Sequence, residues 1–142
     1  MRVYLAAAMT SPDRDLPSIR TLRDHLEASG HVVPTRHIAE VDGRDRDAHL
    51  SDRELARRDI TWLEASDALV AEVTTPSHGV GVEVTLAVTA GLPCLLLHRA
   101  DRTVSRLLLG LDGVQTAAYA SLPDGLSAVD SFLAALDSAR VG

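Results

Sequence analysis

A carboxylate and two glycines, Glu83, Gly79 and Gly81, follow an apolar run over residues 68–73 that is typical of a buried strand. The residues after Gly81 predict a helix that ends at Ala90. Backbone N–H groups at such a turn attract anions, and the helix dipole favours the ionised form of a first-turn carboxylate. This arrangement suits nucleophilic attack on a sugar carbon. The alternative is that the glycines serve a tight turn and Glu83 is an ordinary helix-start charge.

A second carboxylate, Asp59, is predicted on a helix that begins at the capping box formed by residues 51–54 and ends near Ser66. Asp59 either faces the same crevice as Glu83 or is a solvated helix charge. Tyr4 falls early in the first predicted strand, where it either packs in the core or approaches the site. The six histidines show no spacing typical of metal ligands, so we expect neither a metal site nor a cofactor.

Composition excludes several classes of protein. The net charge of −6 and the four aromatic residues argue against binding to a nucleic-acid polymer. All 14 basic residues are arginine, which excludes Schiff-base lysine chemistry and a P-loop lysine. No apolar run is long enough to span a membrane and no signal peptide is recognised, so the expected location is cytoplasmic. The single cysteine, Cys94, is predicted to be a buried structural thiol.

Strand and helix patterns alternate along the chain and predict one α/β domain over residues 1–142. Predicted strands cover 2–8, 31–35, 68–73, 92–98 and 114–119, and predicted helices cover 11–30, 51–66, 81–90, 104–109 and 126–139. We expect a Rossmann-like, flavodoxin-like doubly wound sheet of five parallel strands in the order 2-1-3-4-5. The residues 36–47 form a polar loop, and Ser11 is the expected N-cap of the first helix.

Ligands of such sheets bind beyond the carboxyl ends of the strands, at the point where the strand order reverses. This places the loop 8–11 beside the loop 74–81, with two helix N-termini facing one crevice. Glu72, in a central strand, is expected to pair with an arginine or to lie near the exposed strand end. A Walker P-loop, a dinucleotide-binding glycine fingerprint and a Gly-x-Ser-x-Gly elbow are all absent.

Several short motifs together resemble the nucleoside 2-deoxyribosyltransferase family, and within it the 2′-deoxynucleoside 5′-phosphate N-hydrolase branch. The motifs are Val3-Tyr4-Leu5, Asp59-Ile60-Thr61-Trp62-Leu63, Val70-Ala71-Glu72-Val73-Thr74, Pro76-Ser77, Gly79-Val80-Gly81 and Glu83. The resemblance implies that Glu83 attacks the anomeric carbon and forms a covalent glycosyl-enzyme. It also implies that Asp59 binds the sugar and handles the proton of the leaving base, and that Tyr4 orients the nucleophile.

The same resemblance implies how phosphate is bound. Ser77 is expected to contact the 5′-phosphate, and Ser105 to reach the site from a neighbouring subunit, which requires a homodimer with a shared active site. The first loop departs from the branch, because Ala7, Ala8 and Thr10 replace a glycine, a serine and an arginine. The expected phosphate-binding positions are therefore Ala8, Thr10, Ser11, Ser77, Gly79, Gly81 and Ser105, with Arg14 as a possible substitute cation.

Three functions remain open at this stage. The first is hydrolysis of the N-glycosidic bond of a (2′-deoxy)nucleoside 5′-monophosphate through Glu83. The second is base exchange on an unphosphorylated deoxynucleoside, in which a second base replaces water. The third is a non-catalytic nucleotide-binding module, which would have no need for the anionic nucleophile that this chain carries.

Overall fold

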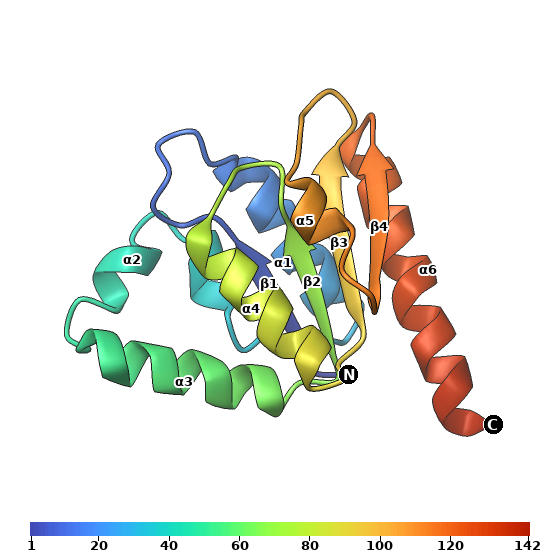
Figure 1. Cartoon of the computed structure of the whole chain (residues 1–142), viewed down its shortest axis with the longest axis horizontal. Coiled ribbons are helices and arrows are strands. Elements are labelled where there is room, and N and C mark those ends of the chain that lie inside the picture. The colour runs from blue at the N-terminus through green and yellow to red at the C-terminus, as the bar shows by residue number, and fades with distance from the viewer.

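Four apolar segments of the chain form one parallel sheet in the computed structural model, which describes residues 1–142 (Figure 1). The strands are β1 (Val3–Ala7), β2 (Ala68–Glu72), β3 (Cys94–Arg99) and β4 (Val114–Tyr119), and they lie side by side in that order. Every residue of β1 and β2 is buried. β2 is a central strand, and β1, at the edge of the sheet, is covered along its outer side by the segment 31–35. The predicted α/β class and parallel sheet are confirmed.

Helices cover both faces of this sheet. On one face α1 (Leu16–Ala28) and α6 (Leu122–Val141) pack against alternate strand residues such as Leu5. On the other face α3 (Asp52–Glu64) and α4 (His78–Thr89) pack against the intervening residues. Figure 1 shows α4 in front of the sheet and α1 behind it. The short helix α5 (Arg106–Leu109) joins the α4 layer. No helix combines the length and the apolar character needed to cross a membrane.

The segment 31–35 does not form the predicted strand, so five strands in the order 2-1-3-4-5 are not confirmed. It contributes one parallel bridge, in which the Val32 N–H donates to Met1 and the Val32 carbonyl accepts from the Val3 N–H. The next ladder donor would be Pro34, which has no N–H. The Thr35 hydroxyl then takes over, accepting from the Leu5 N–H at 3.1 Å and donating to the Leu5 carbonyl at 2.6 Å.

Two predicted helix starts are wrong, and both bear on the site. Helix α1 begins at Leu16, with the Asp15 side chain as its N-cap, instead of at Ser11. Helix α4 begins at His78, with Ser77 as its N-cap. Glu83 therefore lies in the second turn of α4, where the helix dipole acts weakly. The predicted pair of helix N-termini at one crevice is reduced to the N-terminus of α4.

The polar segment 36–47 is more ordered than predicted. It contains a 3₁₀ turn, η1 (Arg36–Ala39), and the short helix α2 (Gly43–Arg46). A Cβ atom at Gly43 would lie 2.1 Å from the His37 carbonyl oxygen, so only glycine fits where this segment folds back on itself. The compact turn keeps the segment against the carboxyl end of β1.

Arginines on and before α1 hold this segment in place. The Arg14 guanidinium donates to the carbonyls of Ile38 and Glu40 at 3.1 and 2.9 Å. The Arg20 Nε atom donates to the Ala39 carbonyl at 2.9 Å, and the buried Arg23 pairs with the Glu40 carboxylate. These bonds satisfy the Ile38 and Ala39 carbonyls and give the Glu40 carbonyl, which also accepts from the Gly43 N–H at 3.3 Å, a second donor. The segment is thereby fixed as one wall of the cavity described next.

Candidate active site

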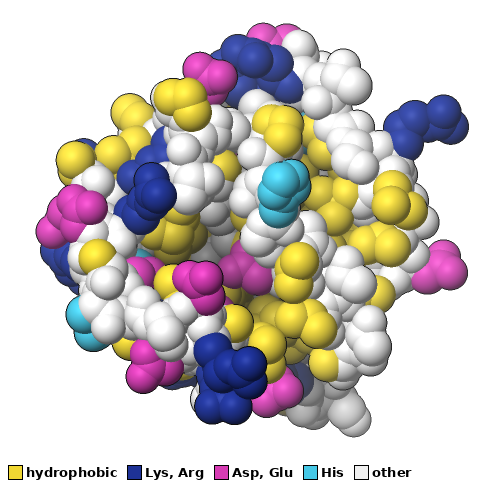
Figure 2. Space-filling view, turned by 60° about the vertical axis from the view of Figure 1, so that its left-hand side comes forward, with side chains coloured by type: hydrophobic (Ala, Val, Ile, Leu, Met, Phe, Trp, Pro, Cys, Tyr) yellow, Lys and Arg dark blue, Asp and Glu magenta, His cyan; other side chains and the backbone are white.

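A cavity of about 700 Å³ opens at the carboxyl end of β1, between α3, α4 and the segment 36–50. Figure 2 shows this side of the molecule, which is hollowed and has acidic side chains gathered around the hollow. Among the predicted site residues, those that line the cavity are Tyr4, Thr10, Asp59, Ser77, Gly79 and Glu83. The structure thus brings together residues from β1, the loop after it, α3 and the start of α4.

Glu83 projects from α4 toward the buried end of this cavity. The Tyr4 hydroxyl donates a 2.6 Å hydrogen bond to Glu83 Oε1. Burial raises the pKa of the Glu83 carboxyl to about 7, Asp59 adds to the rise, and the bond from Tyr4 opposes it. The helix dipole was expected to favour the ionised form of Glu83; instead, burial favours the neutral form. The carboxyl group is poised between the two near neutral pH.

Tyr4 itself is 1% exposed and lies in the sheet core, with only its hydroxyl at the cavity. Burial, reinforced by the Glu83 charge, raises its pKa far above the usual value, so the hydroxyl remains a donor. A buried phenol that keeps its proton can orient a carboxylate without competing with it for charge. Tyr4 therefore packs in the core and also reaches the cavity with its hydroxyl, so the two predicted alternatives are combined in one residue.

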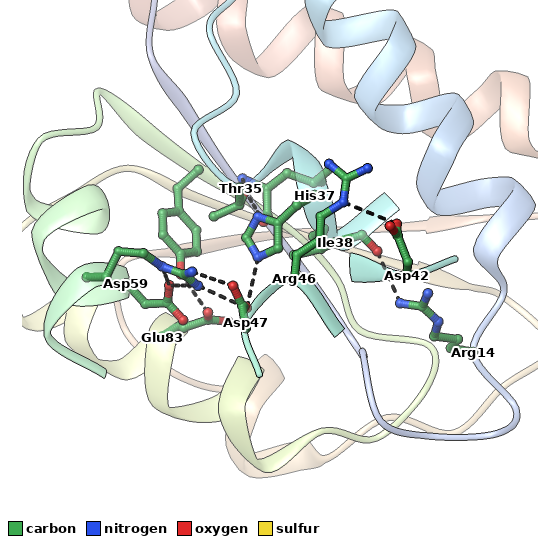
Figure 3. A network of polar contacts seen from close by, with 12 residues as sticks. Arg14, Thr35, His37, Ile38, Asp42, Arg46, Asp47, Asp59 and Glu83 are labelled. Atoms are coloured by element: carbon green, nitrogen blue, oxygen red, sulfur yellow. Dashed lines mark hydrogen bonds and ion pairs between the residues drawn. The ribbon is translucent and has the colours of Figure 1, made fainter. Parts of the chain in front are cut away.

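Asp59 is held by a network of charged side chains that reaches across the cavity mouth (Figure 3). Its Oδ1 atom accepts from Nε and Nη2 of Arg58, at 3.0 and 2.8 Å. The same guanidinium pairs with both oxygens of Asp47, and Asp47 Oδ2 lies 3.1 Å from Nε2 of His37. Figure 3 shows the carboxylates of Asp47, Asp59 and Glu83 converging from three segments of the chain.

The start of α4 supplies hydrogen-bond donors to the same cavity. Ser77 Oγ accepts from the Val80 N–H at 3.3 Å, which caps the helix. Gly79 is in the first helical turn with no positive φ, so the tight-turn explanation does not apply. A Cβ atom at Gly79 would meet only Ser77 Oγ, at 3.9 Å. What glycine provides here is an open approach to the backbone N–H groups of the helix N-terminus.

Four of the predicted positions lie outside this cavity. Ala8 and Ser11 line a neighbouring crevice of about 450 Å³, on the α1 side of the strand ends, together with Arg14. Gly81 and Ser105 line an apolar groove of about 780 Å³ between α4 and α5. Within one chain, then, Ser105 is not part of the Glu83 cavity.

Of the two alternatives predicted for Glu72, the position near the strand end is the one found, because Glu72 is the last residue of β2 and lines the neighbouring crevice. Glu72 does not pair with an arginine: it is 7% exposed, accepts from the Thr74 N–H at 2.6 Å, and accepts from the hydroxyl of Tyr119. The prediction that Arg14 is a substitute cation for the site is corrected. Arg14 is not a free cation, because its guanidinium is occupied by two carbonyl oxygens. Both contacts link segments far apart in sequence, and neither carries a local signal.

Sequence reasoning missed Asp47 and the part played by Arg58. Asp47 lies just after α2, in the segment predicted to be a loop, and its side chain is 11% exposed. The Arg58 guanidinium stacks 4.4 Å from the centre of the Trp62 ring. The one available signal was the length of the polar segment, since long loops in α/β domains are often functional.

The cavity is acidic overall. The carboxylates that line it are Asp45, Asp47, Asp52, Asp59 and Glu83, and the only arginine among its lining residues is the exposed Arg44. His37 and His78 complete the ionisable wall. No group of three histidine, cysteine or acidic side chains is arranged to hold a metal ion. The chemistry available to these residues is that of paired carboxylates, a nucleophile and a proton donor or acceptor.

Comparison with known proteins confirms the resemblance. The sequence profile of the nucleoside 2-deoxyribosyltransferase family matches residues 3–140. A Thermofilum pendens protein, provisionally named 2′-deoxynucleoside 5′-phosphate N-hydrolase 1, is 36% identical over 137 residues, covering 94% of this chain and 95% of its own. The 5-hydroxymethyl-dUMP N-hydrolase of Mus musculus is 35% identical over 112 residues, covering 76% of this chain and 64% of its own.

A solved structure shares the fold. The CMP N-glycosidase BcmB of Clostridium botulinum superposes with a TM-score of 0.70 at 23% identity, covering 93% of this chain and 99% of its own. The profile match over residues 3–140 and the 36% identity to the Thermofilum pendens protein show that the chain belongs to the nucleoside 2-deoxyribosyltransferase family.

Proposed function

We propose that this protein hydrolyses the N-glycosidic bond of a (2′-deoxy)nucleoside 5′-monophosphate, with Glu83 as the nucleophile. The observation that carries the proposal is the position of Glu83: a carboxyl with a pKa near 7, held by Tyr4, at the buried end of a cavity that Asp59 also lines. The names of the relatives, a nucleoside phosphate N-hydrolase and a nucleotide N-hydrolase, agree with this chemistry.

The proposed reaction proceeds by two displacements at the anomeric carbon. First, a Glu83 oxygen bonds to C1′ while the C1′–N bond breaks and its electron pair passes to the base. The Asp59 carboxylate relays to the leaving base a proton drawn from solvent. Water then attacks C1′ of the glycosyl-Glu83 ester and loses a proton to the Asp59 carboxylate. The C1′–O bond to Glu83 breaks, its electron pair returns to the Glu83 carboxylate, and the sugar 5-phosphate is released. Both displacements occur at one carbon, so the configuration at C1′ is retained.

Ser77, Gly79 and Thr10 are the proposed phosphate contacts, since they lie at the N-terminus of α4 and on the facing loop. Ala8 and Ser11 are withdrawn from this set because they line the neighbouring crevice. The remaining contacts are uncharged. A dianionic phosphate would enter a cavity whose lining carries five carboxylates, and this costs part of the binding energy that the donors supply.

That acidity favours base exchange on an unphosphorylated deoxynucleoside as the second candidate. The first half of the reaction is unchanged, and an acceptor base replaces water in the second. The two candidates differ in the fate of the glycosyl-enzyme and in the need for the phosphate group. The acidic lining bears only on the need for the phosphate group.

A homodimer is part of the proposal. Apolar side chains on α3, α4 and α5 are exposed, with fractions of 39% for Ile60, 58% for Val82, 38% for Leu86 and 80% for Leu107. Contiguous exposed apolar residues are typical of a protein interface. Ser105 lines the groove beside Val82, so a second copy seated on this surface would lie against Ser105.

The test is an activity panel with product analysis by chromatography. The purified protein is incubated with deoxynucleosides, ribonucleosides and their 5′-monophosphates, each with and without an acceptor base. Release of free base and sugar phosphate from a monophosphate supports hydrolysis, and formation of a new nucleoside supports exchange. Binding of nucleotides without turnover of any of them would instead support a non-catalytic nucleotide-binding module. Glu83→Gln, matched in size and uncharged, is the control for each active substrate.

A further inference from the structure

Arg58 is the residue around which the polar network of the cavity is organised. Its guanidinium makes hydrogen bonds to carboxylates on two sides: Asp59, its neighbour on α3, and Asp47, which follows α2. The Arg58 and Asp59 side chains are each 23% exposed, and that of Asp47 is 11% exposed. Charge-assisted bonds in so sheltered a place are stronger and less screened than those on an open surface.

The contact between Arg58 and Asp59 does not follow from helix geometry. Successive side chains on a helix point in different directions, and residues i and i+1 do not normally meet. Here the guanidinium is turned toward Asp59 while it lies over the Trp62 ring, 4.4 Å from the ring centre. Asp47 binds its outer edge. His37 reinforces Asp47 through a 3.1 Å contact and approaches Trp62 edge-on, with ring centres 5.9 Å apart.

The bonds to Asp59 are asymmetric. Both N–H groups of Arg58 that reach Asp59 bind the same oxygen, Oδ1. The other oxygen, Oδ2, is thus left for the cavity, which Asp59 lines. A carboxylate anchored by one oxygen has a fixed direction for the other. The anchor therefore orients the group that we propose handles the proton of the leaving base.

Arg58 also bears on Glu83 through charge. The carboxylate of Asp59 raises the pKa of Glu83, after the larger effect of burial. The ionisable groups that face Glu83 across the cavity are Tyr4 from β1, Asp59 and Asp52 from α3, His37, Arg44, Asp45 and Asp47 from the segment 36–50, and His78 from α4. The cation bound directly to Asp59 is Arg58. Without it, the full charge of Asp59 would act on Glu83.

We propose that Arg58 is a positioning residue for the reaction: it aims Asp59 through one oxygen, offsets the Asp59 charge beside Glu83, and ties the segment 36–50 across the cavity through Asp47. The proposal rests on the proposed function, because it assumes that Glu83 must be ionised to attack. It assigns to Arg58 no contact with the substrate. The contact of Arg58 with Asp59 affects the direction and charge of Asp59, whereas its contact with Asp47 holds the segment 36–50, so the two effects can be tested separately.

The test compares kcat/KM against pH for the wild type, Arg58→Gln, Arg58→Lys and Asp47→Asn. In Arg58→Gln we expect the acid limb of the profile to move up by about one pH unit, because Asp59 is no longer compensated. Arg58→Lys keeps the charge and should hold the acid limb near that of the wild type, while kcat falls because the two-pronged contact is lost. A uniform fall of kcat/KM with an unmoved limb in Arg58→Gln would overturn the proposal.

Asp47→Asn is the matched control, because it cuts the tie to the segment 36–50 and leaves the Arg58–Asp59 contact. We expect it to raise KM, by roughly tenfold for one lost charged contact, and not to move the acid limb to higher pH, because it removes a negative charge that faces Glu83. If Asp47→Asn instead moves the limb upward as Arg58→Gln does, the division of roles is wrong. Should circular dichroism show Arg58→Gln unfolded, Arg58→Met, which keeps an alkyl chain over Trp62, carries the same expectation.

A second readout separates this inference from the proposed function. Carbon-13 NMR titration of the glutamate side chains reports the Glu83 pKa without any turnover. We expect the Glu83 pKa to rise in Arg58→Gln relative to the wild type and not to rise in Asp47→Asn. If the wild type turns over no substrate, the proposed function fails while the titration still tests Arg58. If the wild type is active and the titration shows no rise, the inference about Arg58 fails alone.

Discussion

The Tyr4 hydroxyl donates a 2.6 Å hydrogen bond to Glu83 Oε1 and joins the first strand to a helix 79 residues further along the chain. The donor is almost fully buried, and its pKa is raised, so it does not lose its proton in the range in which Glu83 titrates. Glu83 alone would be shifted upward by burial. The bond from Tyr4 brings part of that shift back, and the balance leaves a pKa of about 7.

Replacing Glu83 by Gln or Ala should abolish turnover, because loss of a covalent nucleophile costs several orders of magnitude in kcat. Substrate binding, measured by calorimetry with the same compound, should remain within about tenfold of the wild type. The matched variant is Glu64→Gln, an exposed glutamate at the end of α3, which should be fully active. Activity of Glu83→Gln within about tenfold of the wild type would refute the assignment.

The pH dependence of kcat/KM should show an acid limb with a midpoint near 7, since Glu83 attacks only when it is ionised. Activity therefore rises as pH increases through this midpoint. Tyr4→Phe removes the bond that lowers the pKa, so its acid limb should move to higher pH, by about one unit. A Tyr4→Phe profile superimposable on that of the wild type would mean that the hydrogen bond has no effect on the nucleophile.

The titration of Glu83 should also make the free energy of unfolding depend on pH. The pKa of Glu83 rises from 4.5 to about 7 on folding, so the folded chain binds this proton more tightly than the unfolded chain. The associated stability is fully present below pH 4.5 and is lost as pH rises through 7. Glu83→Gln has no such proton, and at pH 8 it should exceed the wild type in free energy of unfolding, on the order of 2–3 kcal/mol.

Urea unfolding of both proteins at pH 8 and pH 4.5 gives the measurement for this prediction. The difference at pH 8 should shrink at pH 4.5, where the wild-type carboxyl is neutral in the folded state. An equal difference at the two pH values would show that the gain comes from packing rather than from titration.

Sedimentation should show a homodimer at assay concentrations. Val82, 58% exposed on α4, is the sharpest site for disruption, and Val82→Asp should yield monomers with reduced activity. Val141→Asp is the control, since Val141 is 90% exposed at the end of α6, away from this surface. A fully active monomeric wild type would reject both the dimer and the contribution of Ser105 from a partner.

The 5′-phosphate should contribute less here than in relatives that carry an arginine in the first loop. One lost charged hydrogen bond is worth roughly 1.5–3 kcal/mol, so phosphate preference should fall by roughly ten- to a hundredfold. The measurement is the ratio of kcat/KM for a deoxynucleoside monophosphate to that for its nucleoside. A ratio above about ten thousand would show that the phosphate is bound by another route.

Two arginine variants locate that route if it exists. Arg14 holds the carbonyls of Ile38 and Glu40, so Arg14→Ala should lower stability and leave the ratio unchanged. Arg44 is exposed and lines the cavity, so Arg44→Ala is the variant that should lower the ratio. A collapse of the ratio in Arg14→Ala alone would show that Arg14 leaves its carbonyl partners when substrate binds.

The local elements of this fold could be predicted from the sequence. The capping box of Ser51 and Glu54 starts α3 where it was expected, because its signals lie within one helical turn. The apolar runs of β1, β2 and β3 predict buried parallel strands, because such runs must be covered on both faces of a sheet. The pattern of β4 is weaker, and most of its residues are not buried. Spacing also marked Glu83 and Asp59 as candidates for chemistry, and the family resemblance named their proposed roles.

Contacts between residues far apart in the sequence were decided by the tertiary structure alone. The segment 31–35 has the composition of a strand, but Pro34 ends its ladder after one bridge and Thr35 takes the next bonds. The sequence does not indicate which residue contacts Glu72. In the structure its carboxylate accepts from the hydroxyl of Tyr119, 47 residues away. Likewise the ionisation of Glu83 depends on its burial, on Tyr4, and on Asp59 beside it. Local sequence carries dihedral preferences and periodicity, whereas burial and charge at a site are sums over neighbours that only the folded chain brings together.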